Sequence, residues 1–99
     1  MYKLITDYYE QRGLKWPQDA DEALDWALTE LAEAKELLLD RKGGWTRNNP
    51  GNKRHFSQQR FAEELGDIIM MVLVAGIVEG VEPLTALTSK IKRKLREIT

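Results

Sequence analysis

The stretch FAEELGDIIMMVLVAGIV, residues 61 to 78, constrains the fold of this chain more than any other. Its last eleven residues, Ile68 to Val78, carry no charged or hydrogen-bonding side chain. A helix that is apolar on every side is expected to lie inside a protein. Glu63, Glu64 and Asp67 stand directly before it, although burying an unpaired carboxylate costs several kcal/mol. The sequence therefore predicts a compensating cation or a set of hydrogen bonds at this point.

Glycine and proline divide the sequence into four helical segments, and no alternating β-branched run indicates a strand, so we expect an all-α fold. The segments cover about residues 2–12, 19–41 and 57–78 and the stretch from Pro83 onward. Asp19 or Asp21 can cap the second segment, and Ser57 can cap the third. The stretch 43–56 is polar and rich in Gly and Asn, which predicts a loop inside a single domain of residues 1–99.

The charge balance excludes several classes of partner. The chain has 15 basic and 16 acidic residues and a formal net charge of −1, so no global field attracts nucleic acid or an anionic membrane.

The absence of cysteine excludes disulfides, thiolate chemistry and zinc–sulfur sites. Residues 1–13 lack the apolar core of a secretion signal, and Ile68–Val78 is about half of a membrane span. We expect a soluble cytoplasmic protein that binds neither nucleic acid nor a membrane.

Two pairs of acids follow the helical period. Glu30 and Glu33 stand side by side on one face of the second segment, and Glu64 and Asp67 repeat this spacing on the third. If these segments pack antiparallel, the two pairs can face each other. Four such carboxylates would repel one another unless a divalent cation lay among them. Oxygen ligands without His or Cys select hard ions, so Mg²⁺ is the expected occupant and Mn²⁺ the alternative.

Apolar residues lie on the helix face that carries Glu30 and Glu33 and also on the face next to it. Trp26 and Leu37 share the face of Glu30 and Glu33, and an adjacent face carries a leucine stripe: Leu24, Leu28, Leu31 and Leu38. Acids at this spacing most often form a solvated helix surface, and this interpretation stays open for each pair taken alone. The second pair leads into the apolar run, which favours a site over a solvated surface.

The two motifs Glu30-Leu-Ala-Glu33 and Glu64-Leu-Gly-Asp67, within TELAEAKELL and FAEELGDIIMMVL, resemble those of the MazG-like all-α nucleoside triphosphate pyrophosphohydrolases. That family is marked by E-x-x-E followed by E-x-x-D, and the four-helix layout extends the resemblance over nearly the whole chain. The resemblance implies that the four acids bind Mg²⁺ and that water attacks the α-phosphorus of a nucleoside triphosphate, releasing monophosphate and pyrophosphate. Glu33 or Glu63 would accept a proton from that water.

A nucleoside triphosphate carries about four negative charges, so cations are expected beside the acids. Arg60 is the first candidate because it precedes Glu64 by one turn on the same face. Further candidates for the phosphates are Lys90, Lys94 and Lys53, each with a solvated surface charge as the alternative. For the base, the resemblance points to Trp16 with Gln18, ahead of the first acid pair, and the alternative is a core tryptophan.

Two departures from the family concern these substrate contacts. The connection between the acid pairs is longer than in many relatives. The fourth segment reads SKIKRKLRE, where relatives often place an Asn between the basic residues. Both departures leave the four acids unchanged.

Three functions agree with these patterns. The first is pyrophosphohydrolysis of nucleoside triphosphates for nucleotide-pool control or house-cleaning, and the second is hydrolysis of phosphoribosyl-ATP at the same kind of bond. The third is a non-catalytic helical dimerisation module. In each case we expect a homodimer or a dimer of dimers, because four helices of this length cannot cover every side of Ile68–Val78. The resemblance implies the same.

Overall fold

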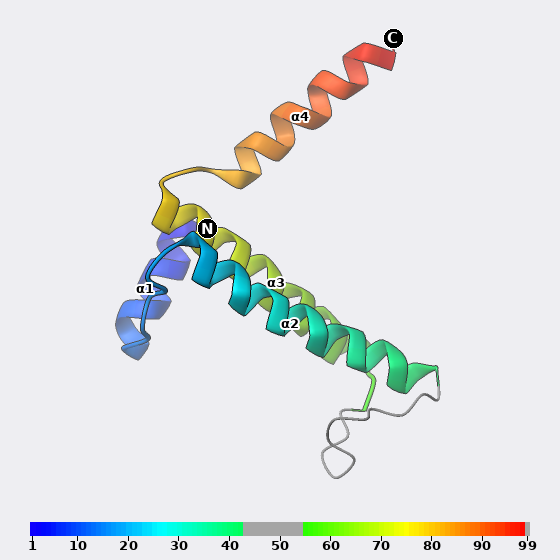
Figure 1. The fold of residues 1–99 in the computed structure, drawn as a ribbon. Coiled ribbons are helices and arrows are strands. Elements are labelled where there is room, and N and C mark those ends of the chain that lie inside the picture. Colours follow the sequence, from blue (N-terminus) through cyan, green and yellow to red (C-terminus); the bar gives the residue numbers. More distant parts are fainter. Residues whose placement is uncertain (43–54, 99) are drawn as a thin grey trace.

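The computed structural model describes residues 1–42 and 55–98 of the chain. These residues form four α-helices and no strand, which confirms the predicted all-α class. The helices are α1 (Tyr2–Arg12), α2 (Ala20–Arg41), α3 (Gln58–Glu79) and α4 (Pro83–Ile98) (Figure 1).

Side-chain caps fix where the two long helices begin. The Asp19 carboxylate accepts a hydrogen bond from the Glu22 backbone N–H at 2.8 Å, so Asp19, and not Asp21, caps α2. The Ser57 hydroxyl accepts from the Arg60 backbone N–H at 3.0 Å, as predicted for α3. Each cap satisfies one N–H that the first turn of a helix leaves without an intrahelical partner.

The antiparallel pair of α2 and α3 is the longest packed unit of the molecule (Figure 1). The face of α2 that is buried against α3 consists mainly of small residues: Ala23, Ala27, Ala34 and Leu37. The predicted leucine stripe lies elsewhere, because Leu24 and Leu28 remain 48% and 63% exposed. Alanines allow the two helix axes to approach closely, and this leaves the larger leucines on an outer face.

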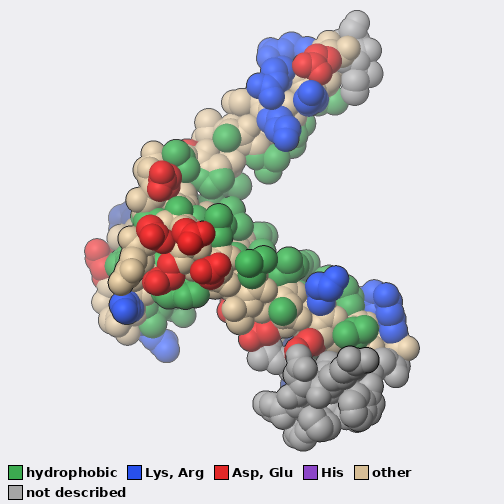
Figure 2. All heavy atoms as spheres, viewed as in Figure 1, with side chains coloured by type: hydrophobic (Ala, Val, Ile, Leu, Met, Phe, Trp, Pro, Cys, Tyr) green, Lys and Arg blue, Asp and Glu red, His purple; other side chains and the backbone are tan. Residues whose placement is uncertain are grey.

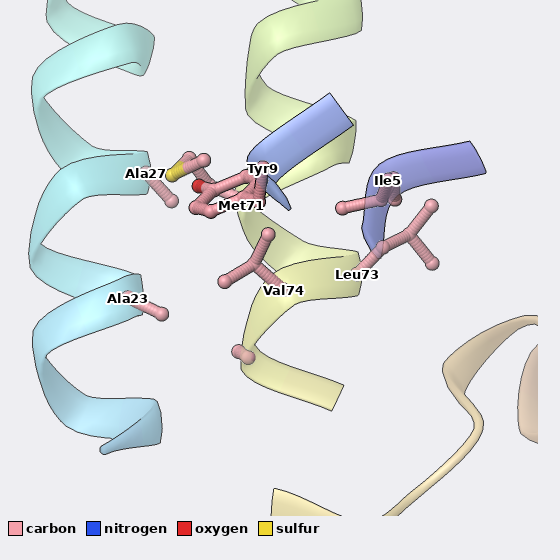
Figure 3. Close-up of a cluster of buried hydrophobic side chains, with 8 residues drawn as sticks. Ile5, Tyr9, Ala23, Ala27, Met71, Leu73 and Val74 are labelled. Carbon is pink, nitrogen blue, oxygen red and sulfur yellow. The ribbon is translucent and has the colours of Figure 1, made fainter. Parts of the chain in front are cut away.

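Helix α1 completes a small core near one end of this pair. Ile5 and Tyr9 of α1 meet side chains of α2 and α3 there (Figure 3). The remaining buried members of this cluster are Ala23, Ala27, Met71, Leu73, Val74 and Ala75. A single chain covers the apolar run of α3 only in part, since Ile69 is 55% exposed and Val72 is 39% exposed.

A tight turn separates α3 from α4. Gly80 ends α3 with a left-handed φ of 78°, a conformation that glycine adopts without the steric cost of a Cβ atom. The Tyr2 hydroxyl donates to the Val81 carbonyl at 2.8 Å, which ties the start of α1 to this turn. Gly76 is packed against the same point, where an added Cβ would lie 2.8 Å from Pro83 Cδ and 3.0 Å from the Val81 carbonyl oxygen.

Helix α4 leaves the turn at 103° to α3 and extends away from the other helices (Figure 1). It packs against α3 near its own start, and its backbone does not closely approach α2 or α1. No described helix is by itself both long and apolar enough to cross a membrane, whereas α3 and α4 meet that criterion when they are taken together across the bend.

Candidate metal centre

The structure brings three of the four predicted acids together at the interface of α2 and α3, and Asp67 is not a member of this close group. One carboxylate oxygen each from Glu30, Glu33 and Glu64 lies within 4.8 Å of the other two. All three residues are half-buried, and they come from two helices that lie side by side. The antiparallel packing of α2 on α3 therefore places the Glu30–Glu33 pair opposite Glu64.

Asp67 belongs to the same electrostatic group. Burial, followed by the negative charges of Glu33 and Asp67, raises the pKa of Glu30 to about 7. Burial and then the charges of Glu33 and Glu63 also raise the pKa of Asp67. Each of these carboxylates thus experiences repulsion from the others in addition to the loss of solvent. A bound cation would offset both effects.

The donor set fits a hard divalent cation. Within the described residues, the group able to hold a metal consists of carboxylates alone. Oxygen ligands favour Mg²⁺ or Mn²⁺ over softer metals, and Mg²⁺ commonly uses a few carboxylates and keeps positions for water and phosphate oxygens. Glu30, Glu33 and Glu64, with Asp67 beside them, meet this requirement.

An open cavity of about 280 Å³ adjoins the acids, and Arg60, the first predicted phosphate contact, lines it. The cavity is also lined by Leu37, Glu63 and Glu64. The Arg60 side chain is exposed, and its guanidinium Nη1 donates to the His55 carbonyl at 3.2 Å. The cavity thus combines carboxylates with one guanidinium, as expected for a site that binds a metal and a phosphate together.

Two of the other predicted phosphate contacts are not near the acids within one chain. Lys90 and Lys94 lie on α4, which touches only the part of α3 next to the turn. Both side chains are exposed, and Lys94 forms an ion pair with Glu97 at 3.5 Å. Lys53 lies outside the described residues.

The predicted base contacts lie toward the start of α2. The half-buried Trp16 ring stacks on Tyr9 with centroids 4.2 Å apart, so one of its faces is already covered. Gln18 is exposed, and its backbone N–H donates to Glu22 Oε1 at 3.2 Å. Trp16 and Gln18 precede α2, and Glu30 follows the first residue of this helix by ten positions. This spacing is about 15 Å along the helix axis.

Trp26 lies closer to the acids in helical register than Trp16 does. It precedes Glu30 by one turn of α2 and is half-buried beside the core. The sequence already places it on the face of the glutamates. Of the two tryptophans that the structure describes, Trp26 is therefore the one whose position best suits a contact near the acids. Trp45 lies outside the described residues.

A contact that the sequence does not indicate fixes the start of α3 against the end of α2. The Asp40 carboxylate accepts from the Phe56 backbone N–H at 2.7 Å. The Arg41 guanidinium lies 4.9 Å from the centroid of the Phe56 ring, within cation–π range. These partners are separated by the long connection, so no local pattern predicts them. They help to set the register in which α3 presents Glu64 to Glu30.

Comparisons of the chain with known protein families, curated proteins and solved structures found no match.

Proposed function

We propose that this protein is an Mg²⁺-dependent nucleoside triphosphate pyrophosphohydrolase, the activity of the MazG-like family that its acid motifs resemble. The observation that supports this most is the convergence of Glu30, Glu33 and Glu64 from two helices within 4.8 Å. A solvated acidic face would separate like charges, because repulsion between them is unfavourable. The adjoining cavity with Arg60 adds a group that can hold phosphate oxygens.

Each side chain has a distinct role in this proposal. Glu30, Glu33, Glu64 and Asp67 would hold the ion, which would supply Lewis acidity and make water more acidic at this point. Arg60 neutralises and orients phosphate oxygens in the cavity. Glu63 also lines the cavity and lies outside the triad, so we assign the proton acceptor to Glu63 in preference to Glu33. Gln59 Nε2 donates to Glu63 Oε1 at 3.2 Å and orients that carboxylate.

The test is pyrophosphate release from a panel of nucleoside triphosphates and phosphoribosyl-ATP, with Mg²⁺ and with EDTA. We expect metal-dependent release from at least one nucleoside triphosphate. Release from phosphoribosyl-ATP alone would favour the alternative substrate. The absence of release from the whole panel would favour a non-catalytic helical module.

Asp67→Asn tests the role of the acids directly. It keeps the shape of the side chain and removes one negative charge from the group, so activity should fall by about a hundredfold or more, as when a catalytic metal is poorly held. Asp25→Asn, at an exposed position of α2, is the matched control and should retain wild-type activity. An Asp67→Asn variant with wild-type activity would contradict the proposed site.

Thermal melts of the same proteins give a second measure of metal binding. A ligand that binds only the folded state raises Tm, so Mg²⁺ should raise the Tm of wild type and of Asp25→Asn more than that of Asp67→Asn. In EDTA, Asp67→Asn should be at least as stable as wild type, because one of several mutually repelling charges is gone. A wild type whose Tm does not respond to Mg²⁺ would argue for a solvated acidic face.

A further inference from the structure

One peptide group ahead of α3 joins the end of α2 to the cavity beside the acids. Its N–H, from Phe56, donates to Asp40 Oδ2 at 2.7 Å. Its carbonyl, from His55, accepts from Arg60 Nη1 at 3.2 Å. The peptide bond is trans, so the N–H and the carbonyl point in opposite directions. Asp40 and Arg60 therefore bind opposite ends of the same planar group.

The charges at the two ends of this peptide group strengthen both hydrogen bonds. The Asp40 carboxylate lies at the positive N–H end of the peptide dipole, and the Arg60 guanidinium lies at the negative carbonyl end. Hydrogen bonds that involve an ion are shorter and stronger than neutral ones, and bonds in a chain polarise one another. A carboxylate at position 40 thus makes the His55 carbonyl a better acceptor for the guanidinium.

Further contacts anchor this peptide group to both long helices. Asp40 is half-buried at the end of α2, and its other carboxylate oxygen lies 3.8 Å from His55 Nδ1. The Phe56 ring has its centroid 4.9 Å from the Arg41 guanidinium of α2 and 6.1 Å from the centroid of the Phe61 ring of α3. The carbonyl that binds Arg60 is therefore held by α2 as well as by α3.

The orientation of Arg60 decides which positive charge a phosphate group meets in this cavity. Arg60 is the cation among the described residues that line it. A group of basic side chains covers the outer half of α4, away from the α2–α3 pair (Figure 2). An exposed arginine samples many rotamers, and ordering it when a ligand arrives costs binding free energy. A guanidinium that is already held at the cavity avoids most of this cost.

We propose that Asp40 is a positioning residue, which acts through the peptide group of residues 55–56 to hold the Arg60 guanidinium ready for phosphate oxygens of the substrate. This inference rests on the proposed function and adds a residue that controls how its cation is presented. One N–H of the guanidinium binds the carbonyl, and the others remain available to a phosphate group. Asp40 lies outside both acid motifs, so the resemblance assigns it no role.

The first test compares the steady-state kinetics of pyrophosphate release in three variants, Asp40→Ala, Asp40→Asn and Arg60→Ala. Asp40→Ala should lower kcat/KM by about threefold to tenfold, roughly the cost of ordering one long side chain on binding. The loss should divide between kcat and KM as it does in Arg60→Ala. Asp40→Asn keeps an oxygen that can accept from the Phe56 N–H and should recover part of the loss. Asp25→Ala, the same substitution at an exposed position of α2, should retain wild-type kinetics.

A double-mutant cycle separates positioning from a general loosening of the fold. If Asp40 acts through Arg60, Asp40→Ala should change kcat/KM by less than about twofold in an Arg60→Ala background. If Asp40 only stabilises the start of α3, the two losses should multiply. Thermal melts of every variant fix an assay temperature at which all of them are folded. Independent losses, or wild-type kinetics in Asp40→Ala, would overturn the proposal and leave the hydrolase activity in place.

NMR relaxation of the Arg60 Nε–H group tests the same link without any turnover. Its signal is assigned by its loss in Arg60→Ala. In wild type its order parameter should exceed that of the exposed Arg12. In Asp40→Ala it should fall to about the Arg12 value, because the carbonyl no longer holds the side chain. Asp25→Ala should match wild type.

This measurement also distinguishes a failure of the inference from a failure of the proposed function. An Arg60 side chain that is equally ordered in wild type and in Asp40→Ala would overturn the inference, whatever the protein hydrolyses. A loss of order in a protein that hydrolyses nothing in the substrate panel would support the link between Asp40 and Arg60 and contradict only the proposed function.

Discussion

Glu30 is the residue on which the electrostatics of the acidic cluster act most strongly. Burial, and after it the charges of Glu33 and Asp67, together raise its pKa to about 7. An acid whose pKa is raised by folding binds its proton more tightly in the native state than in the unfolded state. Ionisation of Glu30 therefore destabilises the native state when no cation is bound.

This shift predicts how stability depends on pH. The contribution of protonated Glu30 is fully present below its ordinary pKa of 4.5 and is lost as pH rises through about 7. Because Glu30 is half-buried, solvent screening limits the loss to roughly 1 kcal/mol, or about 4–8 °C in Tm. Melts in EDTA at pH 4.5 and pH 8 should show this decrease. Glu30→Gln should show a smaller one, and equal decreases in both proteins would contradict the assignment.

Arg60 is the residue on which substrate affinity should depend. Its exposed guanidinium lines the cavity beside Glu63 and Glu64, so Arg60→Ala should change the free energy of unfolding by less than about 0.5 kcal/mol. Loss of a charged hydrogen bond to phosphate, about 1.5–3 kcal/mol, should lower kcat/KM by roughly tenfold to a hundredfold. Arg12→Ala, an exposed change at the end of α1, should leave both unchanged. Wild-type kinetics in Arg60→Ala would show that Arg60 is only a surface charge.

At the scale of single helices, local chemistry determines the boundaries. The predicted ranges 2–12 and 19–41 agree with α1 and α2 to within one residue, because capping side chains, glycine and proline act within one turn. The helical period also predicts that Glu30 and Glu33 share a face. The sequence predicts that these two glutamates face Glu64 only if the two helices pack antiparallel. The structure has this packing.

The choice of the buried face and the direction of α4 are not local properties. The leucine stripe of α2 is its most apolar face, yet Ala23, Ala27 and Ala34 are buried instead, since α3 can approach small residues most closely. The direction of α4 is set by the turn at Gly80 and by the contacts of Tyr2, which come from opposite ends of the chain. The sequence could therefore propose Lys90 and Lys94 as phosphate contacts without predicting their distance from the acids.

Two glycines within α3 allow a matched test of this packing. Gly76→Ala would place a Cβ against the Tyr2 hydroxyl and 2.8 Å from Pro83 Cδ, and overpacking of this kind costs about 1–3 kcal/mol. Gly66→Ala meets no atom within 4 Å, so its higher helix propensity should stabilise the protein by up to about 1 kcal/mol. Urea unfolding of both variants measures the difference. A Gly76→Ala variant as stable as wild type would mean that the turn can relax at little cost.

At the scale of the whole molecule, one chain is an open shape with a small core. The radius of gyration is 16.6 Å and the extents are 45 × 44 × 23 Å, whereas a compact domain of about 100 residues has a radius near 13 Å. A 99-residue chain buries a modest share of its surface even when it is compact. The angle between α4 and the α2–α3 pair reduces that share further, so we expect much of the stability to come from a second copy of the chain.

If a second copy supplies that stability, unfolding and dissociation become one process, and Tm depends on protein concentration. Each tenfold increase in concentration adds about 1.4 kcal/mol to the stability of the dimer, so the wild-type Tm should rise by several degrees between about 1 and 100 μM. Leu87→Glu/Ile91→Glu places two charges on the apolar face of α4, where both side chains are exposed, and its Tm should be lower and independent of concentration. Thr85→Glu/Ser89→Glu, which adds the same two charges on the other side of α4, should keep the wild-type dependence. A wild-type Tm that stays constant over this range would mean that α1 to α3 carry the stability alone, and that α4 contributes nothing to it through a second chain.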